Sequence, residues 1–105
     1  MEDITRKNRL VDGIMIPTVS KEIVSANMLE IEVGTNGSQG GDAGHGCRTY
    51  FRLKNLAGSD MTASVLQNDN CGSDQVVIEL AGDCELYTFI EALEFAVIYL
   101  KELNK

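Results

Sequence analysis

The sequence predicts an α+β fold, in which an antiparallel sheet of about four strands carries one long C-terminal helix packed on one face. Two observations predict this fold: several segments alternate apolar and polar residues between turn-forming clusters, and an apolar repeat of 3.6-residue spacing fills the C-terminal end. The chain has 105 residues, which suits one hydrophobic core, so residues 1–105 are predicted to form a single domain. Residues 1–13 are polar with mixed charge and are expected to form an N-terminal arm.

Residues 28–33 and 48–53 show the clearest strand patterns. Both segments alternate apolar and polar side chains strictly, as half-buried strands do. If the two strands pair in an antiparallel manner, Glu30 and Glu32 of the first lie opposite the two arginines of the second. The polar faces of the two strands therefore carry opposite charges, which favours their pairing.

The remaining strand patterns are less regular. Residues 61–67 and 75–80 flank a dense cluster of turn-forming residues at 68–74, which predicts a hairpin with a long loop. Residues 14–26 contain two apolar clusters separated by the only proline, Pro17. A proline inside a strand pattern is typical of an edge strand or an extended lead-in.

The predicted helix begins near Asp83, which is well placed as an N-cap, and continues to Leu103. Its apolar stripe is expected to cover the sheet and consists of Leu86, Phe89, Ile90, Leu93, Val97 and Leu100. Four further apolar side chains lie off this stripe, namely Tyr87, Phe95, Ile98 and Tyr99. One sheet face cannot bury both sets, so we predict a homo-oligomer or, alternatively, contact with the N-terminal arm of the same subunit.

Charge and composition exclude several classes of partner. The net charge is −7 and the pI is near 4.5, so the surface repels phosphate backbones and nucleic acid is not an expected partner. No apolar run reaches the roughly 18–20 residues of a membrane span, and the N-terminal residues lack a secretory signal pattern. The three cysteines fit neither a disulfide framework nor a zinc site, and a cytoplasmic protein with reduced thiols is predicted.

Glycines concentrate in one segment, GTNGSQGGDAGHG, where six of the ten glycines lie between Gly34 and Gly46. Glycine permits positive φ and close backbone approach, so such a segment can direct several N–H groups at an anion such as phosphate. The segment matches neither the GxxxxGK[ST] nor the GxGxxG pattern, and it leads into a strand rather than a helix. A connection that binds nothing also needs glycines, and this alternative stays open.

The side chains of this segment favour ligand binding, because they supply donors, acceptors and one fork-shaped cation. Arg48 is a candidate partner for phosphate or carboxylate, and Tyr50 on the same strand face can stack on a base. The candidate ligand-binding set is Thr35, Asn36, Gln39, Gly40, Gly41, Asp42, His45, Arg48 and Tyr50.

Metal binding and catalysis are the competing interpretations of the same segment. Asp42, His45 and Cys47 are three possible metal donors, but their spacing matches no zinc pattern. Cys47 with His45 as a base would need an orienting third group, which the sequence does not identify. We therefore predict no metal, no cofactor and no enzymatic activity.

Two blocks of the sequence, EVGTNGSQGGDAGHGCRTYFRL and ELAGDCELYTFIEALEFAV, resemble short uncharacterised proteins of tailed phages and prophages. In size and style the chain is also similar to phage sponge proteins, which sequester cyclic nucleotides or other nucleotide signals of bacterial immunity. The resemblance implies a phage-related context, and a phage-encoded protein would act in the cytoplasm of the host cell.

The sequence therefore leads to one function and one alternative. The first is a non-catalytic protein that sequesters a phosphorylated or cyclic-nucleotide-like ligand through the glycine-rich loop, residues 35–48. The alternative is a protein-interaction module, such as an inhibitor of a host defence enzyme, whose acidic surface engages a basic partner without a small ligand.

Overall fold

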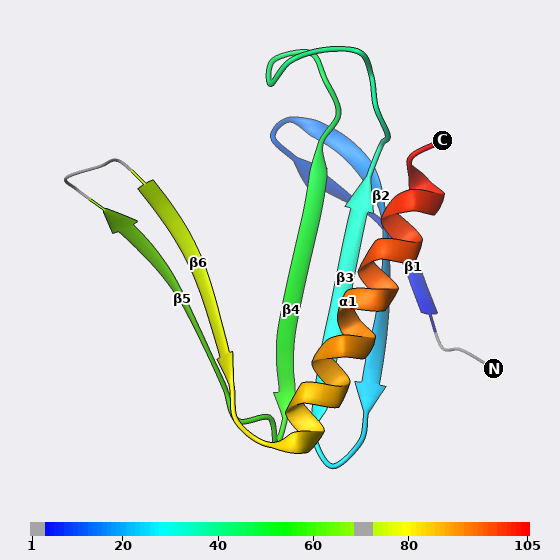
Figure 1. Cartoon of the computed structure of the whole chain (residues 1–105). Helices are drawn as coiled ribbons and strands as arrows, with labels where there is room; N and C mark the ends of the chain where they lie inside the picture. Colours follow the sequence, from blue (N-terminus) through cyan, green and yellow to red (C-terminus); the bar gives the residue numbers. More distant parts are fainter. Residues whose placement is uncertain (1–3, 69–72) are drawn as a thin grey trace.

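A computed structural model provides the structure of the chain and describes residues 4–68 and 73–105. Within these residues, strands occupy the first part of the chain and one helix the last part (Figure 1). The elements are β1 (Ile4–Val11), β2 (Ile14–Val24), β3 (Met28–Thr35), β4 (Thr49–Ala57), β5 (Met61–Asn68), β6 (Ser73–Leu80) and α1 (Asp83–Leu103). A four-stranded antiparallel sheet and a long C-terminal helix confirm the predicted α+β class.

The four-stranded sheet has the order β1-β2-β3-β4, and each strand pairs in an antiparallel manner with the next. The turn between β1 and β2 consists of Asp12 and Gly13, whose φ angles are 51° and 81°. An Asp-Gly pair with positive φ at both residues is favoured in two-residue hairpins, and it places Val11 directly opposite Ile14. Residues 4–11, expected to form an arm, are therefore the edge strand of the sheet.

Two expectations about the strands are wrong. β2 lies between β1 and β3 rather than at an edge, although it contains Pro17 opposite Asn8. β5 and β6 do not extend the main sheet and form a separate two-stranded sheet. The chain leaves β4 through Gly58, whose φ of 67° turns it outward, so β5 does not return along β4.

α1 lies across β3 and β2, and its sheet-facing side is made largely of small residues. Its buried residues are Thr88, Ala92, Phe95 and Ala96, which pack against Val19, Ile23, Ile31 and Val33. The predicted stripe is therefore wrong for four of its six residues, because Leu86, Ile90, Leu93 and Val97 are between 42% and 53% exposed, whereas Leu100 packs against the core. Short side chains let the helix approach the sheet closely, whereas the prediction followed the largest apolar residues.

The bounds of α1 match the prediction, and only the N-cap residue differs. Gly82 is the N-cap residue and Asp83 is the first helical residue, so Asp83 contributes only its charge to the first turn.

Asn27, in the turn between β2 and β3, donates its amide to Thr88 Oγ1 at 2.9 Å and to Ser59 Oγ at 2.7 Å. In the residues that the structure describes, no helix combines the length and apolarity needed to span a membrane.

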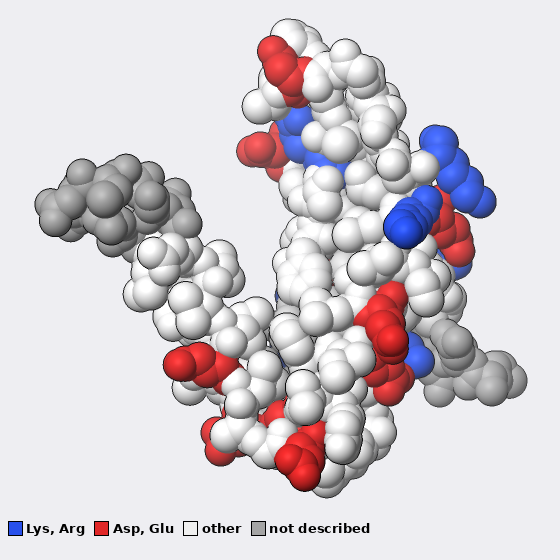
Figure 2. All heavy atoms as spheres, viewed as in Figure 1, with Lys and Arg blue, Asp and Glu red and all other residues white. Residues whose placement is uncertain are grey.

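The β5–β6 hairpin extends away from the main sheet and the helix (Figure 1). It is tied to them near its base, where Ala81 N–H donates to the Asp60 carbonyl at 3.0 Å and Asp60 N–H donates to Glu85 Oε2 at 3.1 Å. Figure 2 shows an open cleft between the hairpin and the body, with few charged side chains on its walls. Residues 69–72 of the predicted turn cluster lie outside the described residues.

The packing of α1 predicts unequal costs for two aromatic substitutions. Phe95→Ala removes a side chain that is only 5% exposed and should lower the free energy of unfolding by about 3–5 kcal/mol. Tyr87→Ala removes a side chain that is 64% exposed and should change it by less than about 0.5 kcal/mol. Urea unfolding of both variants at one protein concentration measures the difference, and equal costs would contradict the assigned buried face.

Candidate functional site

Residues 36–48 join β3 to β4, and their backbone is held by the side chains of the same segment. Thr35 Oγ1 accepts a hydrogen bond from Gly37 N–H at 3.1 Å, and Asn36 Oδ1 accepts one from Arg48 N–H at 2.8 Å. Gln39 Nε2 donates to the carbonyl oxygens of Asn36 and Gly37 at 2.9 and 3.1 Å. These amide and hydroxyl groups, which were predicted to contact a ligand, form hydrogen bonds that stabilise the loop.

Asp42 organises the outer part of the segment. Its carboxylate accepts hydrogen bonds from Gly44 N–H at 2.9 Å and His45 N–H at 3.2 Å, and it lies 3.2 Å from His45 Nδ1. The bond from Gly44 is the main cause of a pKa for Asp42 below its ordinary value, followed by the bonds from His45. An internal carboxylate thus occupies two N–H groups of the segment that was predicted to direct its N–H groups at an external anion.

Most of the glycines are required by the backbone of the segment itself. A Cβ at Gly34 would lie 2.5 Å from a carbonyl oxygen of β2, and one at Gly46 would lie 2.5 Å from the carbonyl oxygen of Gly41. Gly37 and Gly40 have φ angles of 82° and 74°, which L side chains rarely adopt. The concentration of glycines therefore has a structural cause and does not by itself indicate a ligand.

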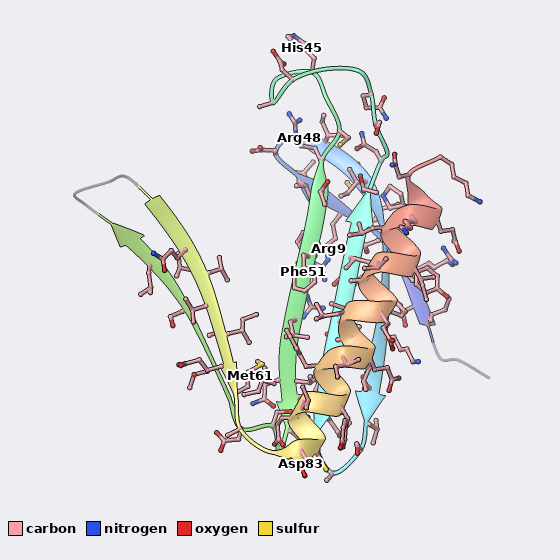
Figure 3. All side chains as sticks on the ribbon, viewed as in Figure 1. Arg9, His45, Arg48, Phe51, Met61 and Asp83 are labelled. Atoms are coloured by element: carbon pink, nitrogen blue, oxygen red, sulfur yellow. The ribbon has the colours of Figure 1, made fainter. Side chains whose placement is uncertain are left out.

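Arg48 lies at the base of the segment and is fixed by backbone oxygens (Figure 3). Its guanidinium donates to the carbonyls of Gly46 at 3.2 Å, Cys47 at 3.4 Å and Asp12 at 3.4 Å, and its side chain is 12% exposed. The only carboxylate within ion-pair distance among the described residues is that of Asp12, at 4.0 Å and 84% exposed. Arg48 is therefore held in place without close neutralisation of its charge.

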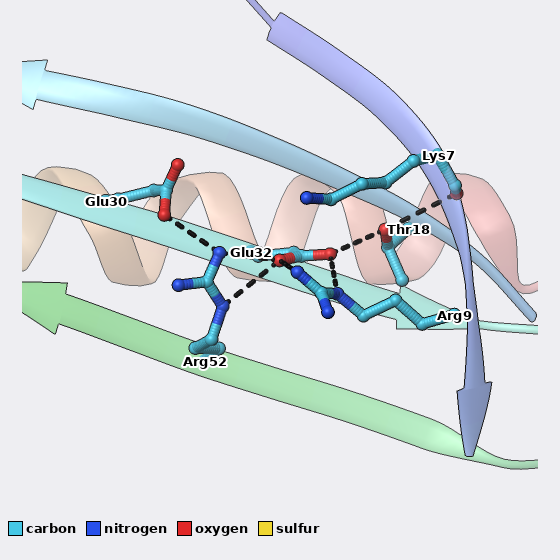
Figure 4. Close-up of polar contacts among 6 residues, drawn as sticks. All are labelled: Lys7, Arg9, Thr18, Glu30, Glu32 and Arg52. Atoms are coloured by element: carbon cyan, nitrogen blue, oxygen red, sulfur yellow. Dashed lines mark hydrogen bonds and ion pairs between the residues drawn. The ribbon is translucent and has the colours of Figure 1, made fainter.

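A buried ion-pair network lies on the same sheet face, away from α1 (Figure 4). Glu32 is fully buried, and its carboxylate accepts hydrogen bonds from Arg9 at 2.5 and 2.8 Å, Thr18 at 2.7 Å and Arg52 at 2.8 and 3.1 Å. Arg52 also donates to Glu30 at 2.8 Å. The predicted pairing of the glutamates with the arginines is confirmed for Arg52, but Glu32 is not a solvated residue.

The pKa of Glu32 reflects two opposing effects. Burial alone raises the pKa, but hydrogen bonds from Arg9, Thr18 and Arg52 outweigh it and lower the pKa from 4.5 to about 2. Hydrogen bonds to Glu32 also raise the pKa values of Arg9 and Arg52. The network is therefore fully ionised near neutral pH.

Tyr50 connects this network with Arg48. It lies opposite Gly34 in the β3–β4 register, and the guanidinium of Arg9 is 5.2 Å from the centre of its ring. Since side chains alternate along a strand, Tyr50 and Arg52 lie on one face of β4, and Arg48 directly precedes this strand. We call Arg9, Arg48, Tyr50 and Arg52 the arginine–tyrosine row.

The predicted ligand set is not gathered in one place. Arg48 and Tyr50 belong to the arginine–tyrosine row, whereas the exposed outer part of the segment contains Gln39, Gly40, Gly41, Asp42 and His45. Thr35 is buried and lines a hollow of about 180 Å³ between the segment and the end of α1, together with Ser38, Cys47, Thr49, Leu100 and Asn104. Asn36 lies between these regions through its bond to Arg48.

The structure separates the residues of the competing interpretations. His45 contacts Asp42, whereas Cys47 is exposed and lines the hollow beside α1. Across residues 4–68 and 73–105, no three His, Cys, Asp or Glu side chains are grouped so that they could hold a metal ion.

Sequence reasoning missed Arg9, Thr18 and Asn104. The Asp-Gly turn was the signal that β1 folds back on β2 and brings Arg9 to the sheet face. No sequence signal pointed to Asn104, which accepts hydrogen bonds from Ser38 N–H at 2.8 Å and Ser38 Oγ at 3.2 Å.

Comparisons of the chain with protein-family models, with curated proteins and with solved structures gave no match. The function is therefore inferred from the residues and contacts of the chain itself.

The Glu32 network predicts a loss of stability in acid. Because the folded pKa lies below 4.5, the carboxylate contributes stability that is present above about pH 4.5 and is lost as the pH falls toward 2. The free energy of unfolding should fall by about 3 kcal/mol over this window. Urea unfolding at about pH 6, 4 and 3 tests this, and Glu32→Gln should give the flatter profile. Parallel profiles for the two proteins would show that Glu32 is not the responsible group.

The two kinds of glycine in the segment predict different tolerance to alanine. Gly34→Ala places a Cβ 2.5 Å from backbone of β2 and should lower the free energy of unfolding by about 1–3 kcal/mol. Gly44→Ala meets only Asp42 Oδ1 at 3.5 Å and should be nearly neutral. Thermal denaturation separates them, since about 1 kcal/mol shifts the midpoint by several degrees in a domain of this size. A neutral Gly34→Ala would refute the proposed close contact.

Proposed function

We propose that this chain is a non-catalytic, homo-oligomeric cytoplasmic protein that sequesters a small phosphorylated or cyclic-nucleotide-like ligand. The observation that carries the proposal is Arg48, a largely buried guanidinium that is held by carbonyl oxygens. Among the residues that the structure describes, its one ion-pair partner is the distant, exposed carboxylate of Asp12. An arginine fixed in this way is prepared to bind phosphate, because little side-chain freedom is lost when the ligand arrives. If the protein is phage-encoded, it acts in the host cytoplasm as a sponge.

The distribution of charge supports the same surface. The chain has a net charge of −7, yet five of its nine lysines and arginines lie on the sheet face away from α1. These five are Lys7, Arg9, Arg48, Arg52 and Lys54. The same face also carries Glu22, Glu30 and Glu32, and the last two neutralise much of the charge of Arg9 and Arg52. The positive charge of Arg48 is what would attract an anion to this part of the face.

Tyr50 supplies the apolar surface that a base requires. The guanidinium of Arg9 lies 5.2 Å from the centre of the ring, and the cation–π attraction between them helps to hold the ring in place. Phosphate on Arg48 and a base beside Tyr50 would lie close together, because Arg48 directly precedes β4 and Tyr50 belongs to the start of this strand. The self-supported loop 35–48 forms the rim of this surface.

A thermal-shift panel of linear and cyclic nucleotides tests the proposal. A ligand at about a hundred times its dissociation constant adds about 2.7 kcal/mol and should raise the midpoint by several degrees. Arg48→Ala should abolish the shift, whereas the matched control Lys54→Ala, an exposed cation on the same face, should retain most of it. Chromatography of the mixtures should recover the ligand unchanged.

The other outcomes are equally informative. A converted ligand would make the protein an enzyme, and an undiminished shift for Arg48→Ala would place the ligand elsewhere. If no nucleotide raised the midpoint of thermal denaturation, the proposal would be refuted, and the protein-interaction module would be the function to test.

A further inference from the structure

Between residues 61–66 of β5 and 75–80 of β6, one face of the hairpin carries only apolar side chains. Side chains of paired strands alternate between two faces, and the register assigns them unambiguously. One face carries Met61, Ala63, Val65, Val76, Ile78 and Leu80, and the other carries Thr62, Ser64, Leu66, Gln75, Val77 and Glu79. Val65 and Val76, which lie opposite each other, are 73% and 74% exposed, so no part of the chain within residues 4–68 and 73–105 covers them.

The opposite wall of the cleft is also apolar and uncovered. α1 covers β3 and β2, so Phe51 on β4 remains 47% exposed, on the side of the sheet that faces α1 (Figure 3). The exposed stripe of α1 adds Leu86, Ile90, Leu93 and Val97. A hollow of about 560 Å³ lies against Leu93, Glu94, Val97 and Ile98.

The apolar face of the hairpin and the exposed stripe of α1 have similar lengths, and both are apolar surfaces that lack a covering element. The eight residues of β5 extend about 26 Å, and the 21 residues of α1 extend about 31 Å. A two-stranded hairpin is marginally stable in water unless its apolar face is covered by another element. The hairpin stands away from α1 and β4 of its own chain, so a second copy is the source that offers both surfaces at once.

The total exposed surface is that of one half of an assembly. A compact monomer of 11.5 kDa is expected to expose roughly 5,800 Å², whereas this chain exposes 6901 Å². Its radius of gyration is 15.3 Å, compared with about 12.9 Å for a compact domain of this length. The excess surface of about 1,100 Å² exceeds the roughly 800 Å² per partner that a standard stable interface buries.

We propose that two copies of this chain form a symmetric dimer in which the β5–β6 hairpin of each copy packs against the α1–β4 surface of the other. The interface is isologous, since each copy gives one hairpin and receives one. Gly58 and Gly82 flank the hairpin with φ angles of 67° and 115°, and they permit the chain to leave and re-enter the body at sharp angles. This dimer is independent of the ligand proposed above.

Sedimentation velocity of the full chain with matched variants tests the dimer. Val65→Glu and Val76→Glu place a charge on the apolar face and should each weaken dimerisation by at least about a hundredfold, without changing the monomer fold, since both positions are exposed in the monomer. Ser64→Glu, on the opposite hairpin face, is the control and should remain dimeric. Val97→Glu on α1 should dissociate the dimer as strongly as the hairpin variants.

Three outcomes would overturn the proposal. A wild-type chain that stays monomeric at about 100 μM would show that no stable dimer forms. Dissociation by Val97→Glu but not by Val65→Glu would mean that helices associate without the hairpins. Dissociation by Ser64→Glu as strong as that by Val65→Glu would mean that the wrong hairpin face had been assigned. Each readout is an oligomeric state, so failure of nucleotide binding leaves the result unaffected.

Discussion

The carboxylate of Glu32 is the interaction on which the sheet depends. Glu32 lies in β3, and it receives hydrogen bonds from β1, β2 and β4 through Arg9, Thr18 and Arg52. One buried anion therefore connects all four strands on the face that α1 does not cover. A buried carboxylate with a single partner would be strongly unfavourable, so the positions of both arginines are constrained together with it. The aliphatic core beneath α1 stabilises the other face.

The sequence allowed correct prediction of features that depend on local pattern. Strict alternation predicted β3 and β4, and the 3.6-residue repeat predicted α1. Features that depend on side-chain size and distant partners were predicted wrongly. Ala92 and Ala96 face the sheet because small residues permit close approach, whereas a count of large apolar residues selected a stripe that is exposed at four of its six positions. Glu32 was assigned to solvent because alternation cannot reveal that β1 folds over it.

In the candidate site, too, the local strand pattern was predicted correctly, whereas the hydrogen-bond partners of the side chains were not. Tyr50 and Arg52 lie on one face of β4, as the predicted alternation requires, whereas Arg48 directly precedes the strand. The polar residues of the glycine-rich segment were correctly recognised as an unusual set, but their main partners are backbone groups of the same segment. Polar loop side chains near glycines often form hydrogen bonds with backbone groups of the turns around them. Composition alone does not distinguish this role from contact with a ligand.

The bond between Ser38 and Asn104 joins the glycine-rich segment to the end of α1. The outward side of the same helix lines the cleft beside the hairpin, so one rigid element is in contact with both surfaces. The glycine-rich segment is therefore attached to the body of the protein at three places: the two strands that it joins, β3 and β4, and the C-terminal end of α1.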